Sequence, residues 1–281
     1  MRWWLIILIK IVVSRLPIPY HFWKASGLFQ HGQMNSLSYS EKIFSMHFKH
    51  FSDQKCQSSF NMLELGPGDS ALSGLYGYLN GAENTYLLDV GSFASRDMNI
   101  YRSAFETWCE HNELKRPQPD FSCFEKFLTS IHTHYCTNGL TDFKIIKDGS
   151  IDFSFSHSVL EHVRKADFNV LLEELYRVSK LGAISSHNID YMDHLGGGQK
   201  NLKFSTAVWE SDMFANSGFY TNRIPPHILH KKVRDSGFRI LQEQFGSWPS
   251  GAMSLEEVHV DLRDVYNQEL SAPTSSLKFS R

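Results

Sequence analysis

The sequence predicts an α/β fold in which a mostly parallel sheet is flanked by helices. Between residues 60 and 190, short apolar runs alternate with segments of helical spacing, the pattern of parallel strands joined by crossover helices. One predicted strand ends in a glycine-rich turn at residues 66–68, and a second ends in an acid about 20 residues later. A chain of 281 residues with 42% hydrophobic and 21% charged residues is long and apolar enough for one generous domain.

Composition excludes some classes of partner. The formal net charge of −2 gives no broad attraction to nucleic acid, so no nucleic-acid partner is expected. The four cysteines are far apart and form no CxxC pair, so neither a metal site nor a disulfide framework is predicted. No oligomeric state is assigned.

Composition also divides the chain. Residues 1–55 form a predicted helical leader, residues 56–245 the main domain with a Gly-, Asn- and Ser-rich loop or cap at 191–225, and residues 246–281 a loosely ordered polar tail. The leader begins with an apolar run that Lys10 interrupts and Arg15 closes, short of the ~20 residues that span a bilayer. We expect a helix that packs on the domain; peripheral membrane attachment, which the paired Trp3 and Trp4 would suit, and a targeting segment are the alternatives.

The first chemical signal is residues 61–70, a strand that enters a helix over 71–79 through a turn containing Gly66 and Gly68. A side chain at either glycine would block close approach of a nucleotide or amino-acid group to the backbone at the helix start. The turn alone also fits a loose dinucleotide fingerprint.

Two acids sharpen the prediction. Glu64 lies two residues before Gly66, where a carboxylate can face a cationic group but would repel a pyrophosphate. Asp89 ends a predicted strand over 85–90, where it can accept both hydroxyls of a ribose. The alternative for Asp89 is a solvated strand end or a helix cap.

The third signal spans residues 150–163, a strand and turn ending in V-L-E-H-V, followed by a helix over 168–178 and a turn over 181–183 that leads into a strand at 184–186. In order and spacing, residues 61–190 resemble class I S-adenosylmethionine-dependent methyltransferases of the type 11-like group. The resemblance implies a Rossmann-like fold with a seven-stranded sheet, S-adenosylmethionine as cofactor and no metal. It implies cofactor contacts at Glu64, Gly66, Gly68, Asp89, Val90, Asp142, Ser156 and His157.

The chain departs from the family pattern at three places. Ser70 replaces the third glycine, and Leu-Gly-Ala at 181–183 replaces a Pro-Gly-Gly turn. The long segment between Asp89 and Asp152 leaves the adenine contact open. Asp142 can hydrogen-bond the adenine amino group, or it can be a plain loop acid.

The leader and the loop resemble a narrower bacterial group associated with surface-polysaccharide or glycan biosynthesis, through residues 16–23, 29–34, 193–198 and 217–223. This implies a small-molecule, glycan or glycolipid acceptor, handled in the cytoplasm or peripherally at the inner face of the membrane. Tyr220, Asn222 and Arg223 are the expected substrate-binding residues. Arg223 suits an acidic or phosphorylated acceptor, and a structural ion pair is the alternative.

A general base is needed only if the acceptor is a hydroxyl. His157, Asp193 and His194 follow predicted strand ends, where ligands bind in this type of fold, and are the expected catalytic residues. His162, His187 and Asp190 are weaker candidates. Two other functions stay open: an NAD-type sugar oxidoreductase or epimerase, which Glu64 disfavours, and a non-catalytic relative, which Ser70 and Leu181 suggest.

Overall fold

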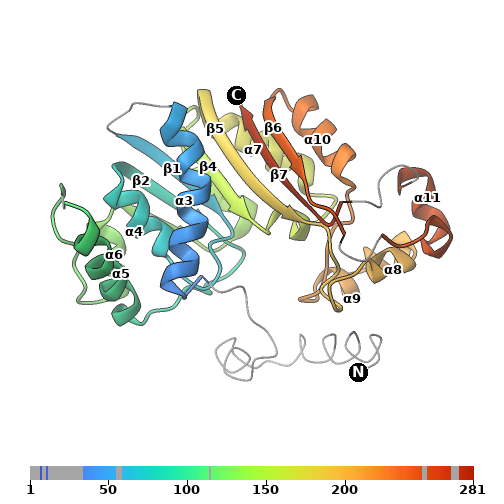
Figure 1. The fold of residues 1–281 in the computed structure, drawn as a ribbon, viewed down its shortest axis with the longest axis horizontal. Coiled ribbons are helices and arrows are strands. Elements are labelled where there is room, and N and C mark those ends of the chain that lie inside the picture. Colours follow the sequence, from blue (N-terminus) through green and yellow to red (C-terminus); the bar gives the residue numbers. More distant parts are fainter. Residues whose placement is uncertain are drawn as a thin grey trace. The chain divides into compact units, whose positions relative to one another are not determined.

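The computed structural model describes Ile7, Ile11 and residues 34–54, 59–113, 115–248, 252–266 and 272–281 (Figure 1). These residues form a seven-stranded sheet of order β3-β2-β1-β4-β5-β7-β6, flanked by helices as predicted. The strands are β1 (Phe60–Leu65), β2 (Ala82–Leu88), β3 (Thr133–Cys136), β4 (Ile151–His157), β5 (Ser179–Asp190), β6 (Arg239–Phe245) and β7 (Thr274–Ser280).

The sheet is mostly parallel. β1 pairs in parallel with both β2 and β4, and β2 pairs in parallel with β3. β7 runs antiparallel to β5. The start of β5 pairs with the end of β7, where the Gly182 amide donates to the Arg281 carbonyl, and the residue after β5 pairs with the start of β7, where the Tyr191 amide donates to the Pro273 carbonyl. The predicted α/β class with a mostly parallel seven-stranded sheet is therefore confirmed.

The chain divides into two compact units, each built from several stretches. The glycine-turn unit comprises residues 30–157, 173–187 and 279–281, and the loop unit comprises residues 1–29, 158–172 and 188–278. The helices are α3 (Leu37–Gln54), α4 (Leu72–Leu79), α5 (Met98–His111), α6 (Phe124–Ser130), α7 (Phe168–Val178), α8 (Thr206–Trp209), α9 (Asp212–Ala215), α10 (Pro226–Asp235) and α11 (Val260–Tyr266), with 3-10 turns η1 (Gly139–Ile145), η2 (Leu160–His162), η3 (Lys200–Lys203) and η4 (Leu255–Glu257).

In the glycine-turn unit, α3 packs on β1 and β4 through an aromatic face. Its buried residues recur at helical spacing, with Phe44, His47 and Phe51 on one side. The Phe51 ring centroid lies 5.0 Å from that of Phe60 and 5.2 Å from that of Phe153. These contacts fix α3 to the two strands whose carboxyl ends carry the predicted motifs.

In the loop unit, Ile7 and Ile11 are helical and buried in a cluster around Trp209 and Phe219. At these two positions the leader packs on protein. Trp3, Trp4 and the motifs within residues 12–33 lie outside the described residues. Within the described ranges, no helix is long and apolar enough to cross a membrane.

Several predicted elements are confirmed. The helix predicted over 71–79 is α4, and the helix predicted over 168–178 is α7 with the same ends. The second strand and the strand before V-L-E-H-V are β2 and β4. After the loop, α10 and β6 complete the stretch that ends at residue 245.

Two predictions are wrong. Residues 274–280 are not a loose tail but β7, in which Ser275, Leu277 and Phe279 alternate inward; serines on this strand concealed its pattern. The turn predicted at 181–183 lies inside β5, which begins at Ser179. Gly182 takes a φ of 77° there, so an irregularity within the strand stands where a turn was predicted.

Tight packing of α4 on β3 gives a test of the fold. A Cβ at Gly74 would lie 2.7 Å from Thr133 Oγ1 and 2.9 Å from Thr133 Cγ2. We expect Gly74→Ala to destabilise the protein by about 1–3 kcal/mol through overpacking, more than the roughly 1 kcal/mol gained from helix propensity. Urea-induced unfolding measures the change.

The matched background is Thr133→Ala, which removes the two closest atoms and leaves only the Cβ of residue 133, at 3.3 Å. In that background Gly74→Ala should be neutral or stabilising. An equal loss of stability with and without Thr133 would show that the contact does not govern this site.

Candidate functional site

The turn after β1 is shaped by two glycines. Gly66 and Gly68 have φ of 66° and 64°, in the left-handed region that favours glycine. The Gly66 amide donates to the Leu88 carbonyl over 2.7 Å. The turn is therefore joined to the carboxyl end of β2.

Asp89 follows β2 and holds the same turn. Its carboxylate accepts from the Gly68 amide over 3.0 Å and from the Val90 amide over 2.7 Å. These bonds orient the carboxylate at the end of β2. Val90 is 80% exposed beside it, an apolar side chain presented to solvent at the strand end.

Glu64 is buried one residue before the end of β1. Burial raises its pKa to about 8; the Ser73 hydroxyl opposes this shift and the Asp89 charge adds to it. Among the described residues, Glu64 Oε2 has no hydrogen-bond partner. The site thus keeps a neutral buried acid ready for a cationic or hydrogen-bonding group.

Ser70, the third residue of interest in this turn, has a structural role. Its buried hydroxyl donates to the Met34 carbonyl over 2.8 Å. This bond ties the segment that precedes α3 to the turn. The next amide, that of Ala71, donates to the Tyr101 hydroxyl over 3.2 Å, so donors at the start of α4 are partly satisfied by the protein.

Asp142 holds its own loop together. Its carboxylate accepts from the Asn138 backbone amide over 2.9 Å and from the Asn138 side-chain amide over 3.0–3.1 Å. It lies in η1, whose start is joined to Asp89 by a bond from the Gly139 amide to the Asp89 carbonyl. A contact from Asp142 to adenine stays a prediction.

At the end of β4, Ser156 is fully buried and its hydroxyl lies 2.7 Å from His187 Nδ1 on β5. The His187 ring stacks on Phe279 with centroids 5.1 Å apart. Burial lowers the pKa of His187 to about 3. His187 is therefore a neutral, weakly basic group, which does not suit a general base.

His157 ends β4 on the side of α3. Its Nδ1 lies 3.4 Å from His47 Nε2, and His47 Nδ1 lies 2.8 Å from the Ser186 hydroxyl. Burial lowers the pKa of His157. Of the three predicted catalytic residues, His157 belongs to the glycine-turn unit, and Asp193 and His194 belong to the loop unit.

Asp193 anchors the glycine loop that follows β5. Its carboxylate accepts from the backbone amides of Leu195, Gly198 and Lys200 over 2.6–3.2 Å. The neighbouring His194 ring stacks on His162, with centroids 4.8 Å apart. Catalytic roles for Asp193 and His194 stay predictions, and the contacts show what Asp193 does for the loop itself.

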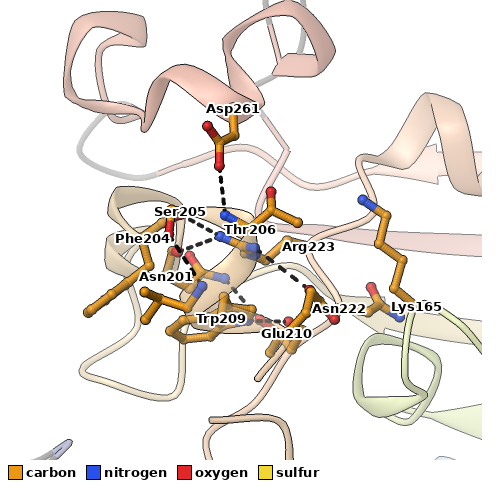
Figure 2. Close-up of polar contacts among 12 residues, drawn as sticks. Lys165, Asn201, Phe204, Ser205, Thr206, Trp209, Glu210, Asn222, Arg223 and Asp261 are labelled. Carbon is orange, nitrogen blue, oxygen red and sulfur yellow. Dashed lines mark hydrogen bonds and ion pairs between the residues drawn. The ribbon is translucent and has the colours of Figure 1, made fainter. Parts of the chain in front are cut away.

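Arg223 lies in a buried polar network of the loop unit (Figure 2). Its Nη1 donates to the carbonyls of Asn201 and Phe204 over 3.3 and 2.8 Å, and its guanidinium lies over the Trp209 ring. Glu210 Oε1 is 3.7 Å from Nη2. These contacts favour the structural ion pair that the sequence left as the alternative.

The other two predicted substrate residues also have internal partners. The Tyr220 hydroxyl donates to Glu210 Oε2 over 2.8 Å. The Asn222 side-chain amide donates to the carbonyls of Leu160 and Val163 over 2.8 and 2.9 Å. Substrate binding by Tyr220, Asn222 and Arg223 stays a prediction.

Sequence reasoning gave no functional role to Glu161, the acid of the V-L-E-H-V motif. Glu161 is buried in η2, and neither carboxyl oxygen has a hydrogen-bond partner within the part of the chain that the structure describes. Burial, with the Asp190 charge, raises its pKa well above the ordinary value. His47 and Ser186 were missed altogether; the helical spacing of His47 with Phe44 and Phe51 was the available signal.

No protein-family model and no curated protein matches the chain. Among solved structures, methyltransferases dependent on S-adenosylmethionine from Methanosarcina mazei and Archaeoglobus fulgidus are similar. The first is 13% identical with a TM-score of 0.48, over 82% of this chain and 96% of that one. The second is 13% identical with a TM-score of 0.46, over 86% and 94%. The likeness concerns fold alone.

The buried Glu161 carboxyl predicts a pH-dependent stability. Because its pKa is raised in the folded state, wild type loses stability as pH rises above the unfolded value of roughly 4.3. Glu161→Gln is neutral at every pH, so its unfolding free energy relative to wild type should increase from pH 5 to pH 8. Urea-induced unfolding at several pH values measures this.

The exposed Glu173 on α7 supplies the control. Glu173→Gln should follow wild type across the same range. A Glu161→Gln difference that stays constant with pH would contradict a neutral buried acid at this position.

Proposed function

We propose that this protein is an S-adenosylmethionine-dependent methyltransferase. The observation that carries the proposal is the pair of acids around the glycine turn. Glu64 presents a buried carboxyl oxygen without a partner among the described residues, and Asp89 presents an oriented carboxylate. A ligand that combines an amino group with a ribose would satisfy both acids, the amino group at Glu64 and the ribose hydroxyls at Asp89.

The residues fit this cofactor group by group. Glu64 would hold the amino group, Asp89 the ribose hydroxyls, and the exposed Val90 would lie against the adenine. Gly66 and Gly68 keep the turn clear of side chains. When bound, the cofactor supplies an electrophilic methyl group, and the protein must hold a nucleophile in line with it and exclude water.

For the acceptor we propose a small-molecule or glycan-type compound, handled in the cytoplasm or at the inner face of a membrane. Motif resemblance in the leader and in residues 193–223 supports this. Two other functions compete with the proposal: an NAD-type sugar oxidoreductase or epimerase, and a non-catalytic relative. Glu64 disfavours the first, because an acid beside the turn repels a pyrophosphate once it is ionised, and it ionises only to hold a cationic group.

Cofactor binding tests the proposal directly. Isothermal titration of the full chain should show micromolar binding of S-adenosylmethionine and S-adenosylhomocysteine and none of NAD. Asp89→Ala should weaken binding at least tenfold, which is about 1.4 kcal/mol. Asp97→Ala removes a carboxylate that accepts from the Asn99 amide and caps α5, and it should leave affinity unchanged.

Binding of NAD alone would contradict the proposed cofactor. Binding of S-adenosylmethionine without turnover on a broad acceptor panel would favour the non-catalytic relative.

The raised pKa of Glu64 gives a second test. Since Glu64 is neutral in the free protein below about pH 8, binding the cationic amino group should ionise it and release a proton. Affinity should then rise by up to tenfold from pH 6 to pH 7. Titrations in buffers of different ionisation enthalpy measure the released proton.

Glu64→Gln should abolish both the proton release and the pH dependence of affinity in that range. Affinity that is equally pH-dependent in wild type and Glu64→Gln would assign the titration to another group.

A further inference from the structure

Three side chains of the glycine-turn unit form a continuous hydrogen-bonded line. The Ser186 hydroxyl on β5 lies 2.8 Å from His47 Nδ1, and His47 Nε2 lies 3.4 Å from His157 Nδ1. Ser186 and His47 are almost fully buried. Both ring nitrogens of His47 are therefore engaged with neighbours on two strands, although His47 itself comes from α3.

The line ends beside the proposed cofactor site. In the sheet, Ser156 on β4 pairs with Leu65 on β1. The next residues along the two strands, His157 and Gly66, therefore stand at the same level of the sheet. Nε2 of His157 makes no hydrogen bond to any residue that the structure describes. Its ring is half-buried at the strand end, where ligands bind in parallel sheets.

Hydrogen-bond chemistry allows two proton arrangements along the line. In one, His157 donates from Nδ1 to His47, which donates from Nδ1 to Ser186. His157 Nε2 then carries a lone pair. In the other, Ser186 donates to His47, which donates to His157 Nδ1, and Nε2 carries the proton.

We propose that His47 is a positioning residue that holds His157 with Nε2 unprotonated, as the base for a hydroxyl-bearing acceptor. This inference rests on the proposed function. As the acceptor oxygen bonds to the methyl carbon and the carbon–sulfur bond breaks, the acceptor O–H bond breaks and its proton goes to His157 Nε2. The proton on Nδ1 stays shared with His47.

The surroundings of His157 suit this role. From α3 it faces the rings of Tyr39 and His47, with centroids 6.4 and 5.6 Å away. On β1 the titratable group at this strand end is Glu64, which pairs with Phe155 and is neutral. The base is thus oriented by neutral groups, and it stays unprotonated at neutral pH because burial lowers its pKa.

His47→Phe breaks the line but keeps a flat ring where His47 packs on Phe155, with centroids 5.2 Å apart. The first readout needs no acceptor: nitrogen-15 NMR of histidine tautomers in the full chain. Wild-type His157 should carry its proton on Nδ1, and in His47→Phe it should shift to Nε2. His50, which is only partly exposed on the same helix and bonds to Gln54 instead of the line, gives the control His50→Ala.

The second readout is methyl transfer to two probe panels, simple hexoses and primary amines. We expect transfer to hexoses, a roughly tenfold lower kcat with unchanged KM in His47→Phe, and a loss of about a hundredfold in His157→Asn. Cofactor affinity should not change in His47→Phe. The role of His47 can therefore fail while S-adenosylmethionine binding, on which the proposed function depends, still holds.

A wild-type His157 protonated on Nε2, or a tautomer that His47→Phe leaves unchanged, would overturn the role of His47. Transfer to amines alone would overturn the hydroxyl acceptor. Absence of S-adenosylmethionine binding in wild type would instead refute the proposed function.

Discussion

Burial of β1 between two parallel neighbours is the constraint on which the site depends. With β2 and β4 paired in the same direction, three carboxyl ends meet at one edge of the sheet. The turn that leaves β1, the acid that ends β2 and the histidine that ends β4 are brought together by that pairing. The aromatic face of α3 covers the strands and supplies His47 from the side.

The same constraint has an energetic consequence at Glu64. A carboxyl with a pKa near 8 in place of 4.5 destabilises the folded state at pH 7 by on the order of 3 kcal/mol relative to an unburied one. A strand interior filled with apolar residues would avoid this. A buried acid at a strand end, next to a turn free of side chains, is more simply understood as part of a binding site.

Much of the fold could be predicted because local signals agreed with the final structure. The ends of α7 matched to the residue, since its apolar spacing is clear and it stands between two strands. β7 could not be predicted from its own residues, because Ser275 and Ser280 are buried polar residues that disguise an inward-facing strand. For the site, Glu64, Gly66, Gly68 and Asp89 lie close in sequence to their strands. His47 lies 110 residues before His157 in the sequence, and no local sequence pattern reveals that the two rings are in contact.

The position of β7 also bears on how the chain folds. This strand lies between β5 and β6 although it is formed by residues 274–280, after both of its neighbours in the sequence. During synthesis, β5 and β6 therefore emerge with their facing edges unpaired. Such edges are prone to wrong pairing with other chains, and the exposure ends only when residues 274–280 have been made and inserted. Completion of the sheet is then a late step, set by translation as well as by hydrophobic collapse.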